Sequence, residues 1–361
     1  MCRGSNSVKF HIDRSMIKAV FLVLILSVVS IFCSCAERGN SDTYRLHTEM
    51  LGTWINVIAT VDQNIDCEEL NDRVAGIDKQ MRSELSLFDN MSLLNRFNRG
   101  EEVTPSRWML YNVKLADSIS RLSNGVYDIT IAPLVKANGF ARKEESIERI
   151  NVDSIMEFVG YKRLIITDDN IIKSDPRMQI DLNSIAKGFT VDLVAQLLEE
   201  YGVESYMVEI GGELRVKGVN LQGDAWRVGI ETPSMGNFIG GSVTQRVAIP
   251  DSSRYKSVAT SGNYRRFHTN AEGKRVVHTI DPLSGKPYES TLLSATVLAE
   301  NCALADGYAT MFMAAGDRGA IELSQRVENC EVLFIFSREN CADDGEYDIY
   351  SSDGMKLFLM E

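Results

Sequence analysis

Two acidic residues stand near hydroxyl or basic side chains at spacings that suit a divalent cation or a phosphate. Asp306 and Thr310 are four residues apart, so on a helix they would share one face. A carboxylate beside a hydroxyl offers the oxygen ligands that Mg²⁺ prefers. On an exposed helix the same pair would be ordinary polar surface. Here Leu304 and Phe312 are apolar neighbours, which places the pair at the edge of a core.

A second segment, residues 180–189, carries Asp181, Ser184 and Lys187 at three-residue intervals. The pattern predicts a strand that passes into the N-terminus of a helix, where unpaired N–H groups and the positive end of the helix dipole favour an anion. Lys187 would then hold a phosphate or a hydroxyl of the ligand. A plain capped helix fits the same residues, and the segment alone does not separate the two interpretations.

Three further segments gather Gly, Tyr, Asp and His. In residues 124–130, Tyr127 offers a ring for stacking and Asp128 an acceptor, although the segment is also typical of a loop. Two glycines at 211–212 interrupt a strand, which indicates a bulge or a backbone that a ligand approaches closely. His278 follows a strand-like run and precedes an Asp-Pro turn, a setting that suits an acid–base residue.

The elements that must position these residues are helices and strands without a strict βαβ rhythm. Helical spacing of apolar residues predicts helices over residues 66–94, 108–122, 192–201 and 303–315. Alternating, β-branched runs predict strands over residues 53–61, 163–167, 171–173, 205–210, 213–216, 226–231, 242–249, 257–260, 293–298 and 331–337. This order predicts an α+β fold of two interlocked layers. No GxGxxG or GxxxxGK[ST] motif occurs, which excludes a Rossmann or P-loop phosphate site.

The composition is that of a globular protein. With 361 residues, of which 44% are hydrophobic and 24% charged, the chain can bury a large core and falls outside the disordered class. A net charge of −12 without a Lys/Arg cluster argues against nucleic acid as a partner. Cys67, Cys302, Cys330 and Cys341 permit one or two disulfides or remain free thiols, and no CxxC zinc motif occurs.

The N-terminus has the pattern of a lipoprotein signal. Arg14 and Lys18 precede an apolar run, residues 19–32, that is short for a bilayer span. The run ends in small residues before Cys35, which we predict to be the lipidated first residue of the mature chain. An uncleaved anchor helix is the alternative, and Met16 is a second candidate start.

These predictions divide the chain into a signal peptide over residues 1–34, a polar tether over residues 35–46 and one folded domain over residues 47–361. Cleavage at Cys35 and an uncleaved anchor both place the folded domain outside the cytoplasm. We therefore expect an exported protein whose cysteines meet an oxidising compartment.

Taken in order, the segments resemble the ApbE family, the FAD:protein FMN transferases, from Leu51 to Gly316. Any one motif is weak, but eight in sequence make coincidence implausible. They are LLNRF at 93–97, GVYDIT at 125–130, DLNSIAKG at 181–188, GGE at 211–213, WRVGIE at 226–231, ATSGNY at 259–264, HTIDP at 278–282 and ADGYAT at 305–310.

The resemblance implies an α+β fold of T-fold-related mixed sheets packed with helices, and it implies a role for individual residues. His278 would be the general base, and Mg²⁺ would be held by Asp306, Thr310 and the backbone carbonyl of Ser184. FAD would be bound by residues from several motifs: Leu51, Phe88, Val126, Tyr127, Asp128, Asp181, Lys187 and Ile280.

Four positions depart from the family pattern. Leu51 replaces the usual Met, and Tyr127 replaces a Phe. Phe88 stands where a Tyr is common, which removes one hydroxyl from the flavin pocket. A Trp that usually follows the Pro-Leu pair is missing from residues 136–140. None of these changes concerns the metal residues or the histidine, so they bear on the detail of the flavin pocket and not on the chemistry.

The implied activity is Mg²⁺-dependent transfer of FMN from FAD to a threonine of an acceptor protein, through a phosphoester, with release of AMP. The implied acceptors are flavoprotein subunits of membrane-associated electron-transfer complexes or other exported flavoproteins. The implied location is the periplasmic side of a bacterial inner membrane, with the lipid as anchor. Two alternatives stay open: an exported FAD pyrophosphatase that yields FMN and AMP, and a flavin-binding lipoprotein without catalysis.

Overall fold

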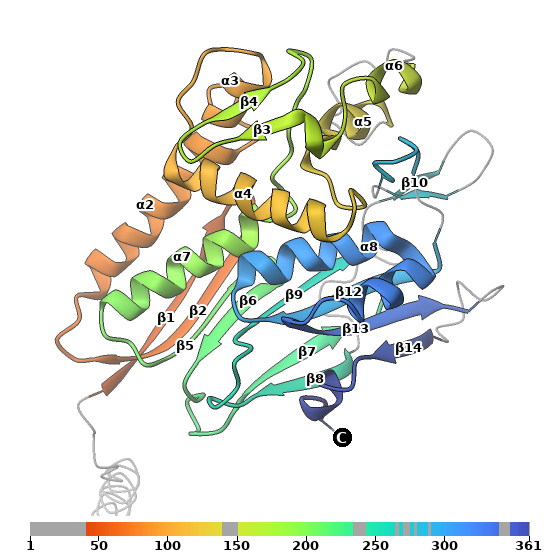
Figure 1. The fold of residues 1–361 in the computed structure, drawn as a ribbon. Helices are drawn as coiled ribbons and strands as arrows, with labels where there is room; N and C mark the ends of the chain where they lie inside the picture. Colours follow the sequence, from red (N-terminus) through yellow and green to blue (C-terminus); the bar gives the residue numbers. More distant parts are fainter. Residues whose placement is uncertain are drawn as a thin grey trace, which may run out of the picture. The chain divides into compact units, whose positions relative to one another are not determined.

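An eight-stranded sheet is the centre of the fold (Figure 1). The structure, a computed structural model, describes residues 41–138, 151–233, 243–263, 267–269, 275–277, 280–287, 290–338 and 347–360. Apart from Ser41, these residues belong to one unit, Asp42–Glu361. From edge to edge the strands are β1 (Ser41–Met50), β2 (Thr53–Asp62), β5 (Ser205–Ile210), β6 (Glu213–Lys217), β9 (Ser257–Gly262), β12 (Leu292–Ala299), β13 (Cys330–Ser337) and β14 (Tyr347–Ser351). The neighbouring pairs from β2 to β14 are antiparallel.

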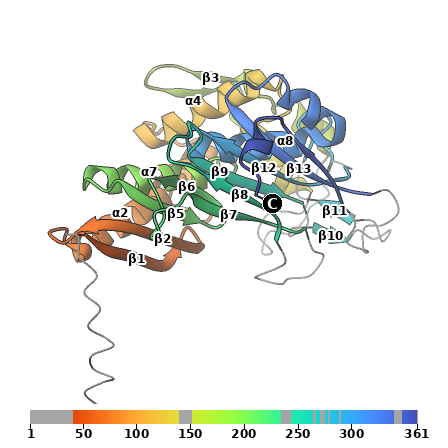
Figure 2. The ribbon, with the colours of Figure 1, turned by 90° about the horizontal axis from the view of Figure 1, so that it is seen from below.

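Helices cover one face of this sheet, which confirms the predicted α+β fold. The long helices α7 (Ala186–Glu200) and α8 (Cys302–Ser324) lie across the strands (Figures 1 and 2). Two more pack around them: α2 (Cys67–Leu85) beside α7, and α4 (Arg107–Leu122) against α8. Strand β2 shows which side chains this helical layer covers. Every second residue, namely Ile55, Val57, Ala59 and Val61, points to the same face of the sheet and is buried.

A hairpin covers part of the opposite face. It consists of β7 (Trp226–Glu231) and β8 (Val243–Ile249), paired antiparallel. Its buried Ile230 and Val247 belong to one apolar cluster with Val216 and Val258 of the sheet. The remaining elements are α3 (Leu93–Asn98), α5 (Ala132–Ala137), α6 (Val152–Met156), the hairpins β3 (Leu164–Ile166) with β4 (Ile171–Lys173) and β10 (Phe267–Thr269) with β11 (Arg275–Val277), and three short 3₁₀ turns at Ile129–Ile131, Tyr161–Arg163 and Met355–Leu357.

The helix predicted over residues 66–94 is two helices, and this prediction was wrong in one place. α2 ends at Leu85, and α3 begins at Leu93 after a turn. The Asn95 side chain holds that turn, because its Nδ2 donates to the carbonyls of Ser86, Leu87 and Asp89 at 2.7–3.3 Å. A polar side chain that offers the backbone such partners competes with helix formation.

Residues 41–46, expected to be part of a polar tether, form the first half of β1. Tyr44 is buried, and its hydroxyl donates to Asn71 Oδ1 of α2 at 2.6 Å. Burial raises the pKa of Tyr44 to about 12. The polar residues around Tyr44 concealed this strand in the sequence, since only one large aromatic side chain marks the buried face.

Within the described ranges, no helix is long and apolar enough to cross a membrane. Cys67 is exposed, Cys302 and Cys330 are buried, and all three are free thiols.

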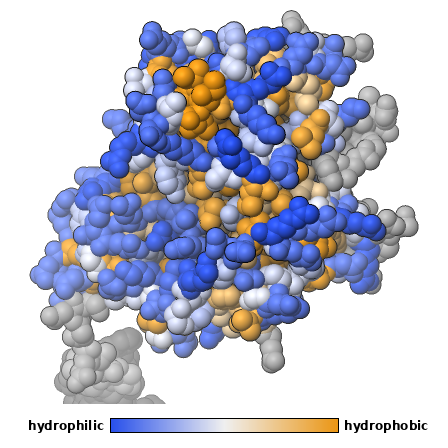
Figure 3. All heavy atoms as spheres, viewed as in Figure 1, coloured by the Kyte–Doolittle hydropathy of each residue, from blue (hydrophilic) through white to orange (hydrophobic). Residues whose placement is uncertain are grey.

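Figure 3 shows an apolar patch over the β3–β4 hairpin, where the cross-strand neighbours Ile165 and Ile172 are exposed.

Candidate functional site

Three charged side chains meet where α7, β6 and α8 come together. Lys187, in the first turn of α7, forms an ion pair with Glu213, the first residue of β6. Glu213 and Asp306 are each only 3% exposed. The negative charge of Asp306, on α8, raises the pKa of Lys187 and of Glu213. Because a buried carboxylate needs a counter-charge, the Lys187 ammonium stabilises two acidic groups at once.

The pKa values in this cluster reflect burial first and charge second. Burial raises the pKa of Glu213 to about 7, against the opposing effect of Lys187. Burial likewise raises the pKa of Asp306. Burial alone would lower the pKa of Lys187, but the charges of Asp306 and Glu213 outweigh it and raise the pKa. A further cation beside the two carboxylates would therefore favour their ionised forms.

Asp306 also joins α8 to the start of α7. Its Oδ2 accepts a hydrogen bond from Gly188 N at 3.0 Å. Gly188 is the third residue of α7, and the N–H groups of a first helical turn have no carbonyl partner inside the helix, so Asp306 supplies the missing acceptor. Ile185, at the N-cap of α7, provides no side-chain cap. A carboxylate from α8 thus satisfies part of the first turn of α7.

The residues predicted to bind Mg²⁺ fit a hard cation as a set. A carboxylate, a hydroxyl and a carbonyl are all oxygen ligands, and Thr310 lies one turn beyond Asp306 on α8. The Thr310 hydroxyl is 3.3 Å from Ser261 Oγ of β9 and forms a hydrogen bond with it. No group of three or more His, Cys, Asp and Glu that could hold a metal occurs in the described part of the chain. A cation here would therefore depend on neutral oxygens as well as on Asp306.

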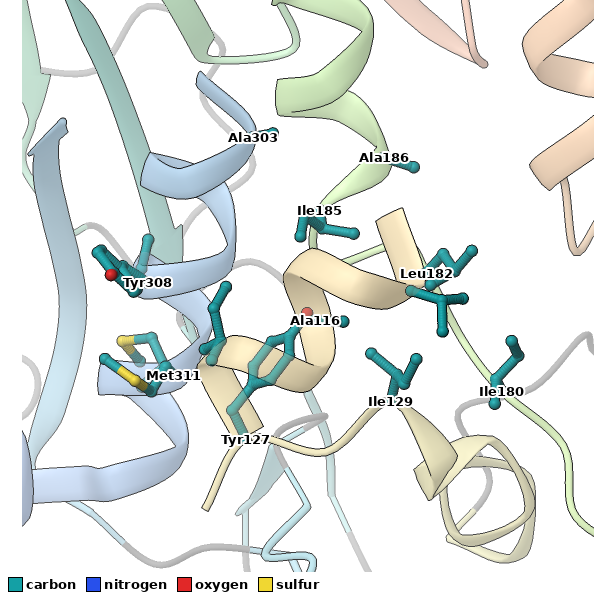
Figure 4. Close-up of a cluster of buried hydrophobic side chains, with 14 of the residues drawn as sticks. Ala116, Tyr127, Ile129, Ile180, Leu182, Ile185, Ala186, Ala303, Tyr308 and Met311 are labelled. Atoms are coloured by element: carbon teal, nitrogen blue, oxygen red, sulfur yellow. The ribbon is translucent and has the colours of Figure 1, made fainter. Parts of the chain in front are cut away.

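Tyr127 connects the predicted flavin segment with the predicted metal segment. Its hydroxyl is 2.7 Å from Ser184 Oγ. The ring is buried in the apolar cluster around Ala116, Ile185 and Met311, between α4 and α8 (Figure 4). Burial raises the pKa of Tyr127 far above its usual range, so the hydroxyl stays neutral. The Phe that is usual in the family could not form this hydrogen bond.

Asp128 organises its own loop. Its Oδ1 accepts from the N–H and the hydroxyl of Thr130, both at 2.7 Å, and its Oδ2 accepts from Tyr161 N at 2.6 Å. Burial raises the pKa of Asp128 in spite of these bonds. Both carboxylate oxygens have protein partners, so the structure gives Asp128 a part in shaping the loop, and its contact with a flavin stays a prediction. Val126, in the same loop, is half-buried.

Asp181 is held in place by a buried amide that the sequence did not reveal. Asn98 Nδ2 donates to Ile180 O at 2.9 Å, and Ile180 N donates to Asn98 Oδ1 at 2.8 Å. Asp181 N itself donates to Ile129 O at 2.8 Å. These bonds fix the backbone at Ile180 and at the N–H of Asp181, next to the Tyr127 loop. Burial raises the pKa of Asp181.

The other predicted flavin residues lie on three separate segments. Leu51, in the β1–β2 turn, has φ 51°, and its N–H donates to Asp78 Oδ1 at 2.8 Å. Phe88 is 67% exposed, in the turn between α2 and α3. Ile280 is buried and forms an isolated bridge with Pro287. Because its side chain packs in the core, Ile280 would contact a flavin only through its backbone.

Two predicted residues, His278 and Cys35, lie outside the described residues. Strand β11 ends at Val277, directly before the histidine. The role of His278 as general base and the lipidation of Cys35 therefore stay predictions.

Gly188 marks a close approach of α7 to α8. A Cβ at this position would fall against the Cys302 carbonyl and 2.8 Å from Asp306 Cβ. We expect Gly188→Ala to lower the free energy of unfolding by about 1–3 kcal/mol or more in urea titrations, because overpacking forces the helices apart. Gly76→Ala is the control: a Cβ there meets nothing within 4 Å, and the variant should gain about 0.5–1 kcal/mol. Equal stability of the two variants would contradict the close approach.

The chain is similar to flavin transferases in sequence and in fold. The model of the ApbE family matches residues 51–334. An FAD:protein FMN transferase of Vibrio cholerae is 34% identical over 342 residues, which cover 93% of this chain and 98% of that protein.

Two solved structures share the fold. The flavin transferase ApbE from Vibrio cholerae superposes with a TM-score of 0.75 at 31% identity and covers 88% of this chain and 99% of its own. The apo flavinyl transferase ApbE from Pseudomonas stutzeri superposes with a TM-score of 0.76 at 27% identity, and the match covers 89% of this chain and 98% of that structure. The α+β fold is thus that of solved flavin transferases. The chain belongs to the ApbE family.

Proposed function

We propose that this chain is a Mg²⁺-dependent FAD:protein FMN transferase that attaches FMN to a threonine of an acceptor protein and releases AMP. Flavin transfer follows from its membership of the ApbE family and from its near full-length similarity to FAD:protein FMN transferases. The single observation that carries the finer proposal is the cluster of Lys187, Glu213 and Asp306, where α7, β6 and α8 meet.

The proposed reaction exchanges one phosphorus–oxygen bond for another. The threonine hydroxyl oxygen attacks the FMN-side phosphorus of FAD, the bond from that phosphorus to the AMP phosphate breaks, and AMP leaves. His278 takes the proton of the hydroxyl. Lys187 holds a phosphate at the start of α7, where the positive end of the helix dipole adds to its charge. The product is a phosphoester-linked FMN.

Asp306, Thr310 and the Ser184 carbonyl are the residues that would hold Mg²⁺. The bound ion would neutralise charge on the pyrophosphate oxygens as AMP departs. Asp306 at the same time accepts from Gly188 N, so it fixes the start of α7. Lys187 is the residue directly before Gly188. The bond between Gly188 and Asp306 therefore also keeps the phosphate-binding lysine at a fixed position relative to the metal residues.

In-gel flavin fluorescence tests this function. The mature chain is mixed with FAD, Mg²⁺ and a purified periplasmic, threonine-bearing domain of an electron-transfer subunit. We expect a fluorescent acceptor band that survives denaturation, an equal amount of AMP, and loss of both with EDTA. Release of AMP from FAD and Mg²⁺ without any band would identify an FAD pyrophosphatase instead. FAD binding without AMP release under any condition would identify a non-catalytic binder.

We further propose that the chain is exported and anchored through a lipid on Cys35, on the membrane face where its acceptors lie. The apolar run at 19–32 and the small residues before Cys35 support this location. Labelled palmitate should enter the wild-type chain and the Cys33→Ser variant, whereas Cys35→Ser should lose both label and membrane fractionation. Label retained in Cys35→Ser would contradict the proposed anchor.

A further inference from the structure

Glu213 is a buried carboxylate with one oxygen paired and the other unpaired. Its Oε1 forms the ion pair with Lys187. Its Oε2 is buried and has no hydrogen-bond partner within the described residues. The Lys187 ammonium is therefore the one ion-pair partner that the described residues give to this buried carboxylate.

The turn before Glu213 explains why it faces Lys187. Gly211 and Gly212 have φ of 62° and 109°, values in the left-handed region that favours glycine. Gly211 N donates to Trp54 O at 3.1 Å, and Gly212 N donates to Glu209 Oε1 at 2.7 Å. The turn is thus fixed on both sides, and it delivers Glu213 to the start of β6, against the first turn of α7.

A second network already joins the same two elements. Arg215 of β6 donates to Asp192 Oδ1 at 3.0 Å and to Glu199 Oε1 at 3.4 Å, and both acceptors belong to α7. This network also holds α7 on β6. The pair of Lys187 and Glu213 differs from it because the charge of Asp306 acts on both of its members.

We infer that Glu213 is a positioning residue: it holds the Lys187 ammonium in place for a phosphate of the flavin nucleotide. The inference rests on the proposed function, in which Lys187 binds FAD. Glu213 also keeps the ammonium from becoming the exclusive partner of Asp306, whose carboxylate then stays available to a cation.

The test is a double-mutant cycle on FAD affinity, measured in EDTA by the quenching of flavin fluorescence. EDTA removes the metal, and no acceptor is needed, so the readout does not depend on transfer. We expect Glu213→Gln to weaken FAD binding roughly five- to tenfold, because a charge-assisted contact is lost. Lys187→Met should weaken it at least as much. The double variant should bind no more weakly than Lys187→Met alone, since Glu213 acts through Lys187.

Glu199→Gln is the matched control, because it removes a carboxylate that pairs with a basic residue across the same two elements. It should bind FAD as the wild type does. Losses that simply add in the double variant, or wild-type affinity of Glu213→Gln, would overturn the inference. A wild-type chain that does not bind FAD would contradict the proposed function itself. Should Glu213→Gln fail to fold, the double variant and Lys187→Met/Glu213→Ala are each compared with Lys187→Met; weaker binding by either than by Lys187→Met overturns the inference.

Discussion

Asp306→Ala is expected to abolish Mg²⁺-dependent transfer of FMN. Asp306 is the one carboxylate in the proposed cation set, and the other two ligands are neutral oxygens. Loss of several kcal/mol of charge stabilisation corresponds to a rate lower by roughly a thousandfold or more. The measurement is the rate of formation of the fluorescent acceptor band over a titration with Mg²⁺. The curve should become flat.

Asp306→Asn separates the charge from the fold. An asparagine at this position retains an oxygen that can accept from Gly188 N, so the junction of α7 and α8 stays formed. We therefore expect a thermal unfolding midpoint closer to that of the wild type than the midpoint of Asp306→Ala, with transfer still lost. Mg²⁺ stimulation that persists in Asp306→Asn would show that the cation is held elsewhere.

The strands could be predicted from the sequence because their signals are local. Residues 171–173, 205–210 and 226–231 were each predicted as strands, and β4, β5 and β7 have these bounds. In residues 205–210 and 226–231 the β-branched and aromatic residues alternate within the segment itself, and residues 171–173 begin with two β-branched isoleucines. The start of α7 was predicted in part. The segment at 180–189 predicts a strand that passes into a helix N-terminus; the helix begins there, at Ala186, but the described residues 180–185 form no strand, and helical spacing was assigned only from residue 192. The first turn is capped from α8 by Asp306, which no local pattern shows.

The site could be predicted only as far as motifs reach. Motifs indicated Asp306, Ser184 and Lys187, and the structure brings Asp306 and Lys187 together and joins Ser184 to Tyr127. The bond between Gly188 and Asp306 spans 118 residues, and that between Asn98 and Ile180 spans 82. No local pattern encodes such partners. The GGE motif contained Glu213, but its pairing with Lys187 became visible only in the fold.

His278→Ala is expected to lower the rate of FMN transfer by roughly 10²–10⁴-fold, which is the usual contribution of a general base. A base that acts only in the transition state changes kcat and leaves the affinity for FAD unchanged. Transfer is measured by in-gel fluorescence, and FAD affinity by fluorescence quenching. His268→Ala is the matched control, because His268 lies in β10, opposite Val276 of β11.

Three results of this experiment decide what the histidine does. A His278→Ala variant that transfers FMN at the wild-type rate would contradict its role as base, and a loss confined to His268→Ala would assign that role to the neighbouring strand. Weaker FAD binding by His278→Ala would make the histidine a binding residue. Hydrolysis of FAD by water needs the same proton acceptor as transfer to threonine. Both rates should therefore fall together, because one base serves either nucleophile.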